Sequence, residues 1–435
     1  MKNTLKLLSL CIVLLFFCCE TENIINDETS YDTTTTSAAK GTSLGNGKKE
    51  LVISYPDGTT EAEKQLKRAE YGVTNYKKCD CADDNLELWI FSGGVSGNIN
   101  IEEKRETAKA DEDLEGADLN PIIQILPDQF ISSPSSGAVE DALNKITNDN
   151  TNITVAVLDT GIDYTYSGFS NSSLYNSQLD GCSSNGYTDR FGWNFVDNNN
   201  NPYDNHPGLH GTIVSHIITS NLDANNVAYQ LLPVKVANHN GNIKYFDAVC
   251  GFQYATKKQN IKIINLSFGW INDSYGILNR FIEEVENEIL VVCSAGNNQE
   301  NNDNVPHYPS SGEAYNILAV AGLSGYITGT GSNPGGSGGN TQGNPTSTGG
   351  LSYFSNHGTN SVDVAAISEN IPFYYNNYTH YVNGTSYSAA YASFFSAYNY
   401  ELNMSAIELK NKVITNSNYS SELSQIKYSA YLLLD

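Results

Sequence analysis

The sequence of 435 residues has few basic side chains. It contains 24 Lys and Arg residues against 48 Asp and Glu residues, which gives a formal net charge of −24 at pH 7. Nucleic acids and anionic membrane surfaces attract proteins of the opposite charge. The composition therefore excludes both as electrostatic partners, although acidity alone names no substrate.

The N-terminus lacks an apolar run long enough to span a membrane. Residues 7–17 form a short apolar run between two lysines and an acidic, polar stretch, which is typical of a secretory signal peptide over residues 1–19. A cysteine at the end of such a run resembles a bacterial lipoprotein signal, in which that cysteine carries the lipid. We therefore expect an exported lipoprotein of the cell envelope or cell surface, lipidated at Cys19 in preference to Cys18, with ordinary secretion as the alternative.

Residues 20–50 contain little to bury and predict a flexible tether. Residues 51–126 then follow the βαβ-βαβ order of a small ferredoxin-like α+β domain. Its strands are expected at 51–55, 73–76, 86–91 and 121–126, and its helices at 62–70 and 101–113. Residues 127–150 hold Pro, Ser and Gly and form a link to the rest of the chain.

The large region 151–435 alternates apolar strands with helices. This alternation predicts an α/β fold with a mostly parallel sheet and helices on both faces. Strands are expected at 154–158, 231–236, 261–266, 289–293 and 317–321, and helices at 245–257 and 277–286. The Gly-, Ser-, Thr- and Asn-rich residues 324–350 predict a surface insertion, and no separate C-terminal binding domain is expected.

Two apolar segments of this region adjoin residues with catalytic potential. The strand 154–158 runs into Asp159 of an Asp-Thr-Gly triplet, at the end of a strand where α/β active sites form. An aspartic protease needs two such triplets or a dimer, and the sequence has one. His210, in a His-Gly-Thr triplet, opens a second apolar segment and alone would also fit a core histidine.

Ser386 precedes a long segment, 387–398, that is almost free of charge. We expect a buried helix there. Its N-terminal N–H groups and dipole would favour an oxyanion that forms beside Ser386. Taken alone, Ser386 would also fit a helix N-cap. No Gly-x-Ser-x-Gly motif surrounds Ser386, which counts against a serine esterase.

The order Asp159, His210, Asn297 and Ser386, each in its own local motif, resembles the subtilisin-like serine proteases, or subtilases. The resemblance runs from about residue 150 to the C-terminus, and it implies a subtilisin-like three-layer fold and a serine endopeptidase. In that family Ser386 would attack the peptide carbonyl and His210 would transfer the proton. Asp159 would orient the imidazole, and Asn297 would stabilise the oxyanion.

The same resemblance assigns other parts of the chain. Residues 51–126 resemble the family's prodomain, which acts as an intramolecular inhibitor and chaperone, and processing would fall within 127–150. Protein or peptide substrates would pair with two backbone edges. These edges would be Ser267, Phe268 and Gly269 on one side, and Ser294, Ala295 and Gly296 on the other.

The chain departs from the family pattern after Ser386, where Tyr387 replaces the usual methionine. This change affects the expected substrate preference more than the expected activity, because no catalytic group is lost. The rival interpretation is a binding protein built on a catalytically degenerate subtilase fold.

Five cysteines follow the predicted signal peptide. Cys79 and Cys81 are too close in sequence to bond to each other, and without a nearby histidine they predict no zinc site. We expect Cys250 and Cys293 to be buried thiols within core elements. The chemistry requires no cofactor. Subtilases often bind structural calcium, but no carboxylate cluster is specific enough to assign a site.

Overall fold

The computed structural model describes residues 49–82, 84–92, 99–125, 137–147, 153–169, 173–271, 273–324 and 350–434. The predicted signal peptide with Cys18 and Cys19, nearly all of the tether, and most of the link and of the insertion lie outside the described residues. Within the described ranges, no helix is both long enough and apolar enough to cross a membrane.

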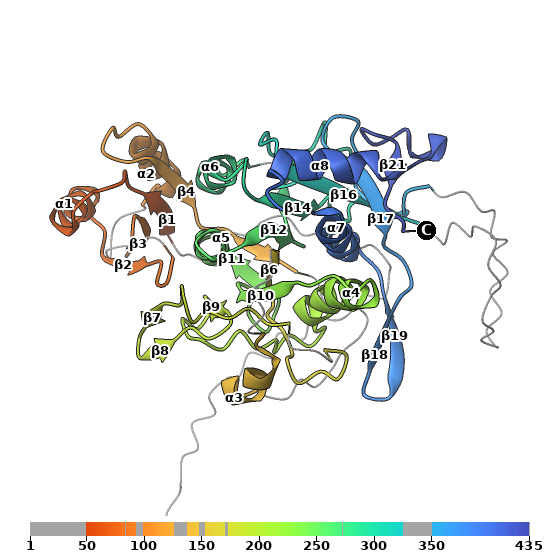
Figure 1. Ribbon diagram of the computed structural model, residues 1–435. Helices are drawn as coiled ribbons and strands as arrows, with labels where there is room; N and C mark the ends of the chain where they lie inside the picture. The colour runs from red at the N-terminus through yellow and green to blue at the C-terminus, as the bar shows by residue number, and fades with distance from the viewer. Residues whose placement is uncertain are drawn as a thin grey trace, which may run out of the picture. The chain divides into compact units, whose positions relative to one another are not determined.

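A small sheet forms from the N-terminal residues of the described chain (Figure 1). Its order is β2-β3-β1-β4, and every neighbouring pair is antiparallel. Thr60 and Asn100 cap the N-termini of its two helices by accepting backbone N–H groups. This is the ferredoxin-like arrangement that the sequence predicts. The elements are β1 (Lys49–Ser54), α1 (Glu61–Tyr71), β2 (Asn75–Lys78), β3 (Leu86–Phe91), α2 (Ile101–Lys109) and β4 (Gly116–Leu119).

The large sheet has nine strands in the order β20-β21-β17-β16-β14-β12-β6-β10-β9. All neighbouring pairs are parallel except β20 with β21, which confirms the predicted α/β class. The strands are β6 (Thr154–Asp159), β9 (Trp193–Asn194), β10 (Gln230–Lys235), β12 (Ile261–Leu266), β14 (Leu290–Ser294), β16 (Ile317–Leu323), β17 (Val364–Ile367), β20 (Asn418–Tyr419) and β21 (Ala430–Tyr431).

Helices cover both faces of the large sheet, and β6 shows why. Val155 and Val157 lie in one buried cluster, and the alternate residues Ala156 and Leu158 lie in another. Because successive side chains of a strand point to opposite faces, an uninterrupted apolar strand must be covered on both. Helices α4 (His210–Ala224), α7 (Thr385–Asn399) and α8 (Ala406–Thr415) belong to the first face, and α5 (Tyr245–Thr256) and α6 (Gly276–Glu284) to the second.

Short ribbons and turns of helix complete the described structure. The two-stranded ribbons are β5 (Ile122–Gln124) with β11 (Asn242–Lys244), β7 (Ser183–Ser184) with β8 (Tyr187–Thr188), β13 (Trp270–Ile271) with β15 (His307–Tyr308), and β18 (Ile371–Tyr375) with β19 (Tyr378–Val382). The short helical turns are α3 (Val139–Ala142) and the 3-10 turns at Leu143–Lys145 and Ser421–Leu423.

The structure corrects the predicted last strand of the small domain. We expected residues 121–126 to close the small sheet, but β4 takes that position. The apolar residues that follow form β5, which pairs antiparallel with β11 of the large region. Ile123 and Ile125 are buried there. The apolar run therefore reflects burial against the large region, not within the small sheet.

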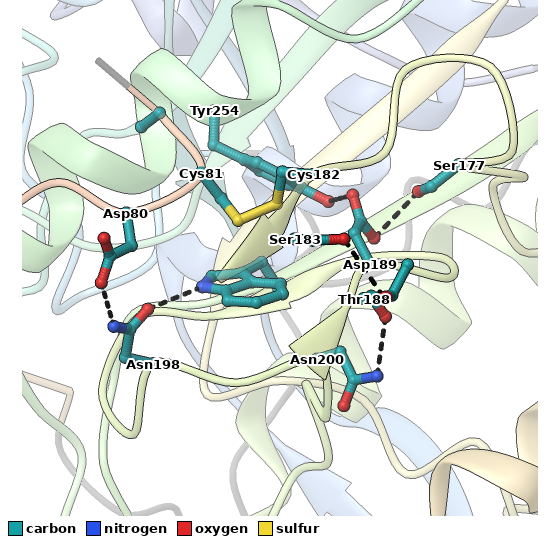
Figure 2. Close-up of a disulfide and its surroundings, with 12 residues drawn as sticks. Asp80, Cys81, Ser177, Cys182, Ser183, Thr188, Asp189, Asn198, Asn200 and Tyr254 are labelled. Carbon is teal, nitrogen blue, oxygen red and sulfur yellow. Dashed lines mark hydrogen bonds between the residues drawn. A yellow bond between two sulfur atoms is a disulfide. The ribbon is translucent and has the colours of Figure 1, made fainter. Parts of the chain in front are cut away.

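The predicted thiol state of Cys250 was also wrong. Cys250 forms a disulfide with Cys79, and Cys81 forms one with Cys182. Figure 2 shows the second bridge beside Tyr254 and Asp189. Cys293 is a buried free thiol, as expected. The sequence separations of 171 and 101 residues explain the error, because pairing over such distances depends on the fold alone.

Candidate functional site

Three polar side chains meet where one strand ends and two helices begin. Asp159 is the last residue of β6, and His210 is the first residue of α4. Ser386 is the second residue of α7, after the N-cap Gly384, so it is not itself the N-cap. Asp159 Oδ1 lies 2.8 Å from His210 Nδ1, and the Thr160 backbone N–H donates to the same oxygen at 2.7 Å.

The glycine after His210 allows α4 to approach β6. A Cβ atom at Gly211 would lie 2.3 Å from the Gly161 carbonyl oxygen and 3.0 Å from Asp159 Cβ. Any side chain there would push the helix away from the strand. The Gly211 N–H also donates to Thr160 Oγ1 at 2.8 Å. The His-Gly-Thr triplet thus fixes the distance between the imidazole and the carboxylate.

Ser386 is held against the end of β12. Its hydroxyl donates to the Ser267 carbonyl oxygen at 2.9 Å, and the Ser267 hydroxyl donates to the Ser386 carbonyl oxygen at 2.8 Å. Asn265 of β12 donates to Ser267 Oγ and accepts from Ser393 of α7. These bonds position the first turn of α7.

Asn297 has a fixed amide orientation. Its Oδ1 accepts both the backbone N–H and the hydroxyl of Thr385, each at 2.9 Å. A backbone N–H can only donate, so the amide oxygen must face Thr385. The Nδ2 donor is therefore left on the other side of the amide, and Asn297 lines the same pocket as Ser386.

Most of the predicted site residues line one pocket. His210, Ser386 and Asn297 line it, and so do five of the six predicted substrate-binding residues, namely Ser267, Phe268, Gly269, Ser294 and Gly296. Ala295 does not line the pocket. Its N–H donates to Val320 and its carbonyl oxygen accepts from Asn302, so its backbone is already used within the fold.

His307 is a pocket residue that the sequence did not reveal. A Cβ atom at Gly269 would lie 2.2 Å from His307 Cε1, and one at Gly296 would lie 3.0 Å from His307 Cδ2. The imidazole therefore contacts both edges and forms a floor between them. Ser310 donates its hydroxyl proton to the His307 carbonyl oxygen, so Ser310 Oγ must accept from His307 Nδ1 at 3.0 Å. Nε2 remains as an acceptor. Burial lowers the pKa of His307 to about 4.

Two further residues lie beside the candidate catalytic residues, namely Tyr387, which the sequence linked to substrate preference, and Lys235, to which it assigned no role. Tyr387 is buried, and its ring centroid lies 5.6 Å from that of His210. Lys235 pairs in register with Asp159, and its ammonium donates to the Thr160 carbonyl oxygen and to Asn205 Oδ1. Burial lowers the pKa of Lys235 to about 8. The sequence signal for Lys235 is that it is the only cation in an otherwise apolar strand. A buried ammonium group requires buried hydrogen-bond partners.

The segment that follows the small sheet, β5 and the residue after it, lies at the pocket. Gln124 and Ile125 line the pocket together with His210 and Ser386. The Ile125 N–H donates to the Gly241 carbonyl oxygen at 2.8 Å, which extends the pairing of β5 with β11. An extended segment therefore runs along one wall of the pocket as an added strand.

Among the described residues, no three His, Cys, Asp or Glu side chains gather closely enough to hold a metal ion.

Comparisons with known proteins point to one family. Residues 150–428 match the Subtilase family, peptidase S8. The major intracellular serine protease of Bacillus subtilis (strain 168) is 32% identical over 185 residues, which are 40% of this chain and 51% of that protein. The chain thus spans about half the length of this curated relative.

Two solved structures are similar to the chain, each with a TM-score of 0.48. One, from work on the assembly of subtilase cytotoxin SubAB, is 19% identical and covers 68% of this chain and 90% of its own. The other, a cold adapted subtilisin-like serine proteinase, is 18% identical and covers 69% of this chain and 100% of its own. Because the match at 150–428 covers more than half of the sequence, the chain belongs to the subtilase family.

Proposed function

We propose that the protein is a serine endopeptidase that hydrolyses peptide bonds through Asp159, His210 and Ser386. The observation that carries this proposal is the 2.8 Å contact between Asp159 Oδ1 and His210 Nδ1, in a pocket that His210 and Ser386 both line. Membership of the subtilase family supports the same reaction.

The three side chains would act in sequence. Asp159 accepts the Nδ1 proton of His210, so Nε2 is the nitrogen that would take the proton of the Ser386 hydroxyl. Ser386 Oγ then attacks the carbonyl carbon of the peptide bond. His210 returns the proton to the departing amine, and a water molecule enters by the same route to release the acyl group.

The oxyanion would form beside two fixed donors. One is the Asn297 Nδ2 amide, whose orientation Thr385 sets. The other is the Ser386 backbone N–H at the N-terminus of α7, where the helix dipole also favours negative charge. Both donors are in place before the substrate binds, so little reorganisation is needed during the reaction.

The substrate would bind as an extended strand between β11 and the edge that begins at Ser267. The antiparallel pairing of β5 with β11 supports this position for an extended peptide. We infer that the small domain is a prodomain whose segment 122–125 inhibits the enzyme, and that processing falls within residues 127–150. Export and lipidation at Cys19 are part of the same proposal, supported by the sequence of residues 1–19.

A general protein substrate tests the proposed function. In the presence of a dithiol, labelled casein should be hydrolysed by the processed wild type and not by Ser386→Ala. Ser388→Ala is a matched control, because Ser388 is buried two residues further along α7 and donates to the Ala366 carbonyl oxygen. The control should retain its activity. If Ser386→Ala hydrolyses casein as fast as the wild type, the assignment is wrong, and if no form is active, the rival binding protein is favoured.

A further inference from the structure

Two disulfides connect the small domain to the large region at one place. Cys79 and Cys81 follow β2 of the small sheet. Cys79 is bonded to Cys250 of α5, and Cys81 to Cys182 just before β7, with Cα–Cα distances of 5.5 Å in both pairs. Figure 2 shows the Cys81–Cys182 bridge and, beside it, Asp80, which accepts from Asn198 of the large region.

Both bridges span the segment where processing is proposed. Cys79 and Cys81 precede residues 127–150, and Cys182 and Cys250 follow them. A cut anywhere in that segment would therefore break the chain without separating its two parts. We propose that the N-terminal domain stays covalently attached to the catalytic domain after processing, and that the two disulfides control its release from the active site.

Noncovalent contacts hold the same two parts together. The Asp118 carboxylate accepts from the Tyr245 hydroxyl at 3.0 Å and from the Ile277 N–H at 2.8 Å. Arg280 of α6 donates to Ser54 Oγ at 2.6 Å and forms an ion pair with Glu115. These contacts place the domain so that β5 stays paired with β11. The disulfides prevent the loss of this arrangement by dissociation.

The consequence for activity rests on the proposed function. A noncovalent inhibitor leaves its enzyme when the solution is diluted below the dissociation constant. A linked one acts at an effective concentration of about the millimolar range whatever the dilution. The segment that ends at Ile125 would therefore keep its place in the pocket after a cut. The cut alone would leave the enzyme inhibited.

Release would then require a dithiol reductant or a second cut within the small domain. Reduction of each bridge takes two electrons and two protons from the dithiol, which becomes a disulfide, and leaves two thiols on the chain. The two bridges differ in access. Cys79 and Cys250 are 3% and 1% exposed, whereas Cys81 and Cys182 are only partly buried. The Cys81–Cys182 bridge should be reduced first, and the Cys79–Cys250 bridge should hold the domains until later.

The covalent attachment can be tested without catalytic activity. The full chain would carry the Ser386→Ala change and a recognition sequence for a site-specific protease inserted within residues 127–136. After cleavage, denaturing electrophoresis should show one species without reductant and two with reductant. The double variant Cys79→Ser, Cys81→Ser should give two species in both cases. Cys293→Ser, which alters the free buried thiol, should behave as the parent. Separation of the parent's fragments without reductant would overturn the proposal.

The control of activity is tested with the same insertion and an intact Ser386. After cleavage, peptide hydrolysis per enzyme molecule should not change on dilution of about 1,000-fold, and a dithiol should raise it about tenfold or more. The double variant Cys79→Ser, Cys81→Ser should gain activity on dilution without reductant. Full activity of the bridged protein after the cut would overturn the regulatory part of the proposal. If no preparation is active, the proposed function fails, and the electrophoresis still decides whether the bridges hold the domains.

Discussion

Thr385 donates both its backbone N–H and its hydroxyl to Asn297 Oδ1, each at 2.9 Å. The residue directly before the candidate nucleophile thus orients the candidate oxyanion donor. The Thr385 hydroxyl also accepts from the Gly296 N–H at 3.3 Å, so one side chain joins the segment after β14 to the start of α7.

The first prediction concerns Asn297 itself. If its Nδ2 stabilises charge that develops only in the transition state, Asn297→Ala should lower kcat by roughly 10²–10³-fold, the loss that the corresponding subtilisin asparagine shows, with little change in KM. Steady-state kinetics on a peptide substrate measure both constants. A loss confined to KM would mean that Asn297 binds the substrate and does not stabilise the oxyanion.

The second prediction concerns the orientation of that amide. Thr385→Val removes one of the two donors to Asn297 Oδ1 and keeps the side-chain shape, so kcat should fall by less than in Asn297→Ala, about tenfold. Thr385→Ser keeps the hydroxyl and should restore kcat. In the Asn297→Ala background, Thr385→Val should have little further effect. An equal additional loss there would show that Thr385 acts independently of Asn297.

The third prediction concerns the residue before the cut. The His307 imidazole fills the floor between Gly269 and Gly296 and offers Nε2 as an acceptor. The enzyme should therefore prefer short side chains with an N–H or O–H donor, such as Ser or Asn, over Phe or Leu. His307→Ala should raise kcat/KM for Phe and Leu substrates by about tenfold or more.

The exposed His239 provides the matched control for this pocket. The peptides of a substrate library that varies at the residue before the cut are ranked by kcat/KM. His239→Ala should not change this ranking. An unchanged ranking in His307→Ala would place the floor of the pocket elsewhere.

The fourth prediction concerns acid stability. Burial lowers the pKa of His206 and of His307 to about 4, against about 6.5 in an unfolded chain. Between these values the unfolded state binds protons that the folded state does not, so the free energy of unfolding falls as the pH drops from 6.5 to 4.

Denaturant titrations at a series of pH values, in the Ser386→Ala background and with the disulfides intact, measure the slope of the free energy of unfolding against pH. His307→Gln should make it shallower, because one titrating group is removed, whereas His239→Gln should not change it. A slope that is the same in His307→Gln and the parent would contradict the assigned protonation of His307.

The sequence predicted the parts of the site that have local signals. The apolar strand before Asp159, the triplet at His210 and the uncharged helix after Ser386 each combine a motif with a periodicity. The large sheet follows from the same alternation, and β6 and α7 lie where they were expected.

The features that the sequence missed depend on residues far apart in the chain. Cys79 and its disulfide partner Cys250 are 171 residues apart. The strand β5 was assigned to the wrong sheet, because an apolar run shows that a segment is buried but not what covers it. His307 lies in the short strand β15 and has no local signal in the sequence. Only the contacts with Gly269 and Gly296 reveal its place in the pocket.

Covalent labelling of Ser386 by a fluorophosphonate tests the central claim most directly. The reagent reacts with a serine whose hydroxyl a neighbouring base activates, and peptide mass spectrometry identifies the modified residue. The labelling is measured on protein as isolated and on protein cut in the link and reduced. We predict that Ser386 is modified in the cut and reduced wild type, and that His210→Ala lowers the labelling rate of this preparation by several orders of magnitude. Modification of another serine alone, or labelling of His210→Ala at the wild-type rate, would contradict the account.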